Sequence, residues 1–272
     1  MQPTSPSRRW ISAGFVSVMM FLAASLMTRA ADIRRIALDG VTPVPSPVVK
    51  ICNDGTRRID EVKQPALELF PAAQKPTRGT ILVCSGGGYN LLAVSKEGWD
   101  VARKLNQFGY DAAVLLYHVH AGKETRQLAL ADAKSALQLL QKQGARLGLN
   151  PKRIGVMGFS AGGHLVARLA HVTATNSPPD FLVLLYPAYL EKGGRLLDEV
   201  APVKTPAFVY AAADDPYVPS AIAYGAACRA AHVPCDYYLK PHGGHGFGLM
   251  PNRADDVKDW PDKLKAFLDK QD

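Results

Sequence analysis

Few cysteines occur in this chain of 272 residues, and the motifs of several large protein classes are missing. There is no G-x-G-x-x-G leading into a helix and no G-K-[ST], so a nucleotide is not an expected ligand. Histidine and cysteine do not fall at the spacings of metal ligands, and no metal or other cofactor is predicted. Lysine and arginine do not cluster with aromatic residues, which argues against a nucleic-acid partner.

Long apolar runs are also lacking, except near the N-terminus. An arginine pair there precedes an apolar stretch over 10–27, and small residues follow it. This order predicts a secretory signal peptide over 1–30, cleaved after Ala30. An uncleaved membrane anchor is the alternative, because the stretch approaches the length that spans a bilayer. We expect an exported protein, periplasmic or secreted, in which 31–272 form one domain with no stable membrane span after cleavage.

Part of the net charge of +8 belongs to this leader. Residues 1–30 contain three arginines and no acidic residue, so the rest of the chain carries 8 − 3 = +5. An excess of this size is typical of a solvated surface and does not define a partner by itself.

The rest of the chain alternates between short apolar runs and helical segments. The apolar runs predict strands over 80–84, 112–117, 153–157, 181–186, 207–212 and 235–240. Helices are expected over 97–108, 126–146, the segment after 160, 219–231 and 255–269. Short apolar strands separated by helices indicate an α/β fold, with a mostly parallel, doubly wound sheet and helices on both faces. Two earlier segments, 35–38 and 66–70, are expected as antiparallel edge strands.

The apolar run at 153–157 leads into Gly158-Phe159-Ser160-Ala161-Gly162, and a helical segment follows. A serine on such a G-x-S-x-G turn between strand and helix has an exposed hydroxyl above a helix N-terminus. Glycine is needed at both ends because the turn leaves no room for side chains. The pattern alone recurs by chance, so its flanking elements and its partners decide its meaning. With them, it predicts that Ser160 is the nucleophile of an α/β-hydrolase.

A serine nucleophile needs a base, and the base needs an orienting acid. In this fold the acid follows the serine along the chain, and the histidine follows the acid. The strand at 207–212 runs into Asp214-Asp215-Pro216. Asp215 is the preferred acid because it directly precedes the proline and begins the turn away from the strand. Asp214 is the alternative.

The strand at 235–240 leads into a glycine-rich loop that carries two histidines. His245 has a glycine on either side and is the predicted general base, and His242 is its competitor. His164, four residues after Ser160, is expected to pack beside the turn rather than to take part in chemistry.

Acyl transfer also needs hydrogen-bond donors for the oxyanion. One should be the N–H of Ala161, which follows the nucleophile, and the other should come from the loop after the strand at 80–84. That loop contains three consecutive glycines, Gly86 to Gly88, which let the backbone turn its amides towards a substrate. Tyr89 and His118 are the candidate substrate-binding residues, although the sequence by itself favours a surface loop for His118.

Together these segments resemble α/β-hydrolase serine esterases of the acetyl xylan and feruloyl esterase type, which are related to the hormone-sensitive-lipase group. The resemblance covers roughly 60–270 and rests on the segments 84–89, 96–98, 116–117, 153–164, 214–219 and 243–248. It implies a triad of Ser160, Asp215 and His245, with the oxyanion surrounded by Gly87, Gly88 and Ala161.

The chain departs from this family pattern at two places, and both bear on the substrate. Ser85 stands where the usual H-G-G-G motif has histidine, and Tyr117-His118 stands where a tyrosine-arginine pair is common. Neither departure affects the triad residues.

Only 55 positions (215 − 160) separate Ser160 from Asp215, and a helix, two strands and their loops already fill this span. Little or no lid is therefore expected, which favours short acyl groups on a soluble or polymeric alcohol. The resemblance suggests acetyl esters of carbohydrate, either small molecules or polysaccharides. One alternative function is a peptidase or amidase of the same fold, which would be expected to carry a gating domain or a larger cap. The other is a non-catalytic binding protein of this fold, in which the triad would be broken.

The four cysteines permit disulfides in an exported chain. A local bridge between Cys228 and Cys235 fits their short separation, whereas Cys84 is expected to be a buried thiol. The oligomeric state does not follow from the sequence.

Overall fold

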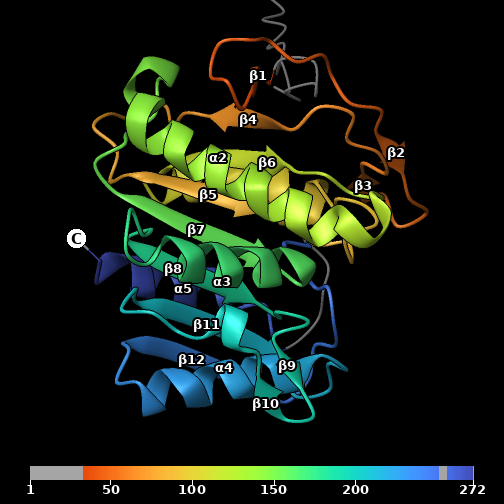
Figure 1. The fold of residues 1–272 in the computed structure, drawn as a ribbon, viewed down its shortest axis with the longest axis vertical. Coiled ribbons are helices and arrows are strands. Elements are labelled where there is room, and N and C mark those ends of the chain that lie inside the picture. Colours follow the sequence, from red (N-terminus) through yellow and green to blue (C-terminus); the bar gives the residue numbers. More distant parts are fainter. Residues whose placement is uncertain (1–32, 251–255, 272) are drawn as a thin grey trace, which may run out of the picture.

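The computed structural model describes residues 33–250 and 256–271 (Figure 1). The predicted signal peptide at 1–30 lies outside the described residues. Eight strands of the described part form one central sheet in the order β1-β4-β6-β5-β7-β8-β11-β12. Their bounds in chain order are β1 (Arg35–Ala37), β4 (Ala66–Phe70), β5 (Thr80–Cys84), β6 (Asp111–Leu116), β7 (Ile154–Phe159), β8 (Phe181–Leu185), β11 (Ala207–Ala212) and β12 (Cys235–Lys240).

The sheet is parallel from β6 to β12 and antiparallel at the other end. β5 pairs in parallel with β6 and β7, and the parallel pairing continues through β8 and β11 to β12. β4 runs antiparallel to both β1 and β6. The carboxyl ends of the parallel strands therefore meet at one edge of the sheet, where α/β proteins place their ligand sites.

Five α-helices of the described chain connect and cover the strands. They are α1 (Asp100–Gln107), α2 (Thr125–Leu147), α3 (Ala161–Thr173), α4 (Val218–Ala230) and α5 (Trp260–Asp269). In Figure 1, α2, α3 and α4 lie in front of the sheet and α5 lies behind it. A short π-helical turn, η2 (Ser95–Trp99), directly precedes α1. The smaller elements are the 3-10 turns η3 (Gly122–Glu124) and η4 (Asp198–Val200) and the two-residue strands β2 (Lys50–Ile51), β3 (Arg57–Arg58), β9 (Glu191–Lys192) and β10 (Arg195–Leu196).

The core lies on both faces of the parallel strands. Every residue of β5, β6, β7, β8 and β11 is buried, whereas the edge strand β12 is partly exposed. Continuous apolar runs such as Phe181–Leu185 suit strands that are covered on both sides. No helix among residues 33–250 and 256–271 combines the length and apolarity needed to cross a membrane.

The structure confirms the α/β-hydrolase fold class and the antiparallel pairing of the two early strands, and it shifts several element bounds. Only β1 lies at the edge of the sheet, because β4 pairs with β1 on one side and with β6 on the other. The last helix begins at Trp260 rather than near 255, with Pro261 in its first turn and turn conformation over 256–259. Proline suits a helix start because it lacks the N–H that would need a partner further inside. The helix expected from 97 begins instead as the π-helical turn η2.

The local disulfide that fitted the sequence is not formed in the structure. Cys228 and Cys235 are both free thiols, and Cys84 is buried in β5 as expected. A hydrogen bond between the two thiols, together with burial, raises the pKa of Cys228.

The contrast between a central strand and the edge strand gives a stability prediction. Leu82→Ala in β5 removes a fully buried side chain and should lower the free energy of unfolding by about 2–5 kcal/mol. Leu239→Ala in β12 makes the same change at a side chain that is 40% exposed, and it should cost less than about 1.5 kcal/mol. Denaturant unfolding of both variants checks this, and equal losses would contradict the assigned core.

Candidate active site

Ser160 lies on a strained turn between β7 and α3. Its backbone has φ 51° and ψ −118°, an unusual conformation for a residue other than glycine. A Cβ placed on Gly158 would lie 2.1 Å from the Gly162 carbonyl oxygen, and one on Gly162 would lie 2.1 Å from the Cys84 oxygen. The two glycines of the motif are thus required by close backbone approach. The turn places Ser160, which is 8% exposed, at the carboxyl edge of the sheet.

The structure brings Ser160, His245 and Asp215 together in one hydrogen-bonded chain. Ser160 Oγ lies 2.7 Å from His245 Nε2, and His245 Nδ1 lies 2.8 Å from Asp215 Oδ2. Asp215 is only 2% exposed, and its second oxygen accepts the N–H of Tyr217 at 2.7 Å. The carboxylate is thereby fixed in place and aimed at the imidazole. Such a chain lets the imidazole accept the serine proton while the acid holds the ring in one orientation.

The competing residues Asp214 and His242 occupy a different and exposed position. Asp214 accepts the backbone N–H groups of Gly243 and Gly244, at 3.2 and 2.7 Å. These bonds, Gly244 first, lower the pKa of Asp214. His242 Nδ1 lies 3.9 Å from Asp214. Asp214 therefore anchors the loop that carries His245, and the geometry of an orienting acid belongs to Asp215.

The glycine loop, Gly86 to Gly88, lies next to the nucleophile. Gly87 and Gly88 have φ values of 131° and 64°, and Ala161 is the first residue of α3. Gly86 uses both of its backbone groups internally, with its N–H bound to Glu97 and its carbonyl bound to Ala93. Among the hydrogen bonds of the described residues, none is donated by Gly87 or Gly88. Their role as oxyanion donors stays a prediction.

Tyr89 directly follows the glycine loop and lies inside the protein. Its side chain is buried, and its hydroxyl is 2.7 Å from His164 Nδ1. His164 is completely buried on α3 beside the turn, as the sequence predicted. Burial, with the nearby Arg126 and Arg168 charges, lowers the pKa of His164 to about 3, so its ring is neutral at pH 7. A direct contact of Tyr89 with substrate stays a prediction, and the contacts recorded for this residue are internal.

His118 is held against α2. Its backbone N–H and its ring Nδ1 both contact Asp132 Oδ2, at 2.9 and 2.8 Å. None of the contacts recorded for the described residues joins His118 to Ser160, His245 or Asp215. Its predicted substrate contact is therefore untested.

Two tyrosines that sequence reasoning did not single out form a rim beside the imidazole. The Tyr217 ring lies 4.8 Å from the His245 ring, and the Tyr189 ring lies 5.5 Å from the Tyr217 ring. Tyr217 is 38% exposed, and the Arg126 guanidinium lies 4.8 Å above the Tyr189 ring. Both tyrosines follow parallel strands at the carboxyl edge of the sheet. Because ligand sites of α/β proteins lie at this edge, their position in the sequence could have identified them as site residues.

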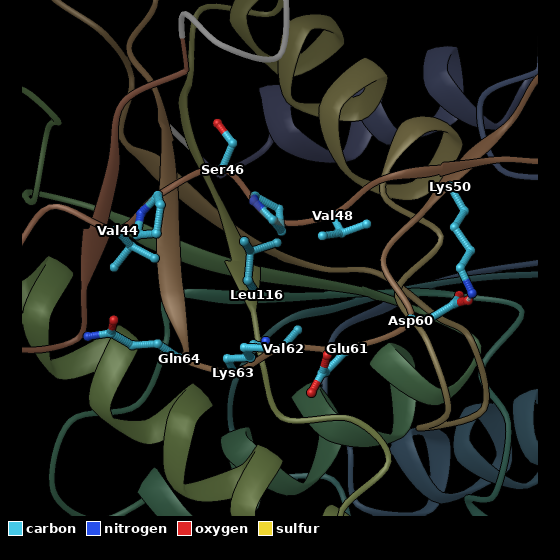
Figure 2. Close-up of a pocket in the computed structure, with 12 residues that line it drawn as sticks. Val44, Ser46, Val48, Lys50, Asp60, Glu61, Val62, Lys63, Gln64 and Leu116 are labelled. Carbon is cyan, nitrogen blue, oxygen red and sulfur yellow. Dashed lines mark ion pairs between the residues drawn. The ribbon is translucent and has the colours of Figure 1, made fainter.

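A separate cavity of about 460 Å³ lies elsewhere on the molecule (Figure 2). It is lined by the proline-rich segment 44–48 and by residues 60–64, with Leu116 at its centre. An ion pair of 2.5 Å joins Lys50 and Asp60 at one end. None of Ser160, Asp215 and His245 is among its lining residues, so this cavity is distinct from the candidate active site.

The fold and the turn at Ser160 place this chain among proteins of the α/β-hydrolase fold. A family model described as alpha/beta hydrolase fold matches residues 81–203. The crystal structure of an acetyl ester-xyloside bifunctional hydrolase from Caldicellulosiruptor lactoaceticus is similar, with a TM-score of 0.66 and 28% identity. That match covers 76% of this chain and 88% of the other.

Two curated proteins resemble the chain in sequence. An acetylxylan esterase of Xylanibacter ruminicola is 28% identical over 205 residues, which are 65% of this chain and 42% of that protein. Endo-1,4-beta-xylanase B of Butyrivibrio fibrisolvens is 27% identical over 206 residues, which are 62% of this chain and 32% of the other. The chain therefore spans less than half the length of either relative. These similarities confirm the resemblance drawn from the motifs.

The buried His164 predicts part of the pH dependence of stability. The unfolded chain binds a proton at this residue below about pH 6.5, whereas the folded protein does so only near pH 3, so acid favours unfolding. Between pH 7 and pH 5 this residue alone should lower the free energy of unfolding by about 2 kcal/mol.

Denaturant unfolding of His164→Gln at the two pH values checks this prediction. The variant should lose less stability than the wild type between pH 7 and pH 5, and the difference should be about 2 kcal/mol. His232→Gln, at an exposed histidine, is the matched control and should keep the wild-type pH dependence. An unchanged slope in His164→Gln would contradict a neutral buried imidazole.

Proposed function

We propose that this chain is an exported serine esterase that hydrolyses short-chain carboxylic esters, in particular acetyl esters of carbohydrate. The observation that carries the proposal is the hydrogen-bonded chain from Ser160 through His245 to the buried Asp215. The names of the relatives, acetylxylan esterase and acetyl ester-xyloside hydrolase, support the acetyl and carbohydrate parts of the proposal. Export rests on the predicted signal peptide at 1–30.

The reaction begins when His245 Nε2 takes the proton of Ser160 and the serine oxygen attacks the ester carbonyl carbon. The oxyanion that forms accepts hydrogen bonds from the N–H groups of Ala161 and of Gly87 or Gly88. The ester C–O bond then breaks, and the alcohol leaves with the proton held by His245. Water, deprotonated by His245, attacks the acyl-enzyme and releases the carboxylic acid together with free Ser160.

The surroundings of the imidazole favour a sugar alcohol as the leaving group. His245 protonates that group, and Tyr217 lies against His245. The exposed Tyr217 ring and the adjoining Tyr189 ring offer broad flat apolar faces for packing. Between β8 and β11 the described chain forms only the two-residue strands β9 and β10 and the turn η4. This short excursion supports an open site without a large lid.

Acyl preference and the nucleophile can be tested together. Nitrophenyl esters of increasing acyl length should be cleaved best at two to four carbons, and acetylated xylan should release acetate. Ser160→Ala should lower kcat by at least about 10⁴-fold, because no other side chain replaces the nucleophile. Rates with both substrates are measured on folded protein. Preference for acyl chains beyond about eight carbons would rule out the substrate class, and activity surviving in Ser160→Ala would rule out the mechanism.

The two neighbouring aspartates provide a matched pair for the orienting acid. Asp215→Asn should lower kcat by about 10³- to 10⁴-fold, since the amide no longer holds the imidazole in the productive tautomer. Asp214→Asn makes the same change one residue away and should cost less than about 10-fold, because it weakens only the exposed contacts with Gly243 and Gly244. Steady-state kinetics on both variants decide the assignment, and a larger effect at Asp214 would reverse it.

A further inference from the structure

A buried carboxylate lies directly behind the glycine loop. Glu97, in the π-helical turn η2, is 3% exposed. Its Oε2 accepts the N–H of Gly86 at 2.7 Å, and its Oε1 accepts the hydroxyl of Tyr186 at 3.0 Å. A Cβ placed on Gly86 would lie 2.8 Å from Glu97 Oε2 and 2.9 Å from Ser160 Cβ. The backbone of the glycine loop is therefore clamped between this carboxylate and the nucleophile.

Tyr186 continues the connection from Glu97 to the loop that carries His245. It follows β8 directly, is 1% exposed, and has a φ of 36°. Its hydroxyl donates to Glu97 and accepts the N–H of Gly248 at 2.9 Å. Its ring lies 5.2 Å from the His245 ring and 4.3 Å from the Phe247 ring, in edge-to-face geometry. Tyr186 is thus both a hydrogen-bond link and a wall for the imidazole.

Lys96 adds a second connection between the same two regions. Its Nζ donates to the carbonyl oxygen of Gly246 at 2.6 Å, and its own carbonyl accepts the N–H of Leu249 at 2.8 Å. The turn η2 consequently contacts the glycine loop through Glu97 and the His245 loop through Lys96. The glycine loop follows β5 and the His245 loop follows β12, and these two strands are not neighbours in the sheet. Strand pairing alone therefore does not fix the distance between the two loops, whereas the contacts of η2 connect them directly.

We propose that Glu97 and Tyr186 are positioning residues that set the glycine loop and the His245 loop at a fixed separation. The proposal rests on the proposed esterase function, because it concerns the same site. The link runs from Gly86 through Glu97 and Tyr186 to Gly248, and each of its three hydrogen bonds is internal to the protein. It holds the N–H groups of Gly87 and Gly88 over the carbonyl carbon that Ser160 attacks, while His245 stays within reach of the serine oxygen.

A carboxylate suits this position because both of its oxygens act as acceptors for donors on opposite sides. Burial raises the pKa of Glu97 above its ordinary value, and the Lys96 charge and the bonds from Gly86 and Tyr186 offset only part of this shift. Burying a carboxyl group costs stability that an apolar side chain would not cost. A glutamine has one acceptor oxygen and one NH₂ group, so it can satisfy only one of the two donors. Glu97→Gln therefore removes one of the two acceptors while keeping the size of the side chain, and it leaves either the Gly86 N–H or the Tyr186 hydroxyl proton without its partner.

The test uses Glu97→Gln and Tyr186→Phe in the full chain. Each variant should lower kcat for a nitrophenyl acetate substrate by about 10- to 100-fold, with KM within about threefold of wild type, because donors aimed at a developing charge act in the transition state. A short-chain trifluoromethyl ketone, which forms a hemiketal oxyanion on the serine, should bind more weakly by the same factor by which kcat/KM falls. A merely structural role would not produce this parallel.

Two matched substitutions at buried groups elsewhere serve as controls. Asp111→Asn alters a buried carboxylate at the amino end of β6, where it binds Lys75, Thr77 and two backbone N–H groups. Tyr210→Phe removes a tyrosine hydroxyl that contacts Asp259. Both should lower stability and leave kcat/KM within about threefold.

Hydrogen exchange gives a readout that needs no turnover. Amide exchange over 85–89 and over 243–249 should rise together by about tenfold or more in Glu97→Gln and Tyr186→Phe, and not in Asp111→Asn. Folded variants with wild-type kcat, or exchange that rises in only one loop, would overturn the proposal. A wild type that hydrolyses no ester would instead overturn the proposed function, and the exchange result would still decide whether the link exists. If Glu97→Gln does not fold, Tyr186→Phe carries both measurements.

Discussion

The hydrogen bond between Ser160 and His245 is the contact on which the rest of the site depends. Its two residues come from loops that follow β7 and β12, so neither the strand pairing nor the helix packing alone brings them within 2.7 Å. Three kinds of support converge on it: the strained turn under Ser160, the buried Asp215 behind the imidazole, and Tyr186 and Tyr217 on the sides of the ring. The surrounding structure holds the imidazole where it can accept the serine proton.

Strand spacing explains why an imidazole fits between the serine and the acid. Ser160 follows β7 and Asp215 follows β11, and β8 lies between these two strands in the sheet. Neighbouring strands are about 4.8 Å apart, so the two strand ends are separated by about 10 Å. A ring with one nitrogen facing each side, and a hydrogen bond at each nitrogen, can span such a gap. The tip of β8 is left to Tyr186, which lies against the same ring.

Much of this architecture could be predicted from local patterns in the sequence. The strands β5 and β11 have the expected bounds, because continuous apolar runs bordered by turn residues mark buried parallel strands. The partly exposed edge strand β12 also has the expected bounds, 235–240. Asp215 was preferred over Asp214 from the following proline, and the structure gives it the buried position facing His245. The roles of Glu97 and Tyr186 could not be predicted, since they depend on contacts between residues 89 positions apart and on no short motif. The inward placement of Tyr89 could not be predicted either, because it depends on a contact with His164, which lies on another element.

The two aspartates after β11 have separate tasks although they are adjacent in the chain. Asp214 faces outward to the amides of Gly243 and Gly244, and Asp215 faces inward to His245. Inserting or deleting one residue between Ala212 and Pro216 would move these carboxylates relative to their partners and disrupt both tasks at once. Natural variation in this segment should therefore appear as replaced residues and not as altered length, whereas surface loops at the opposite edge of the sheet are free to lengthen.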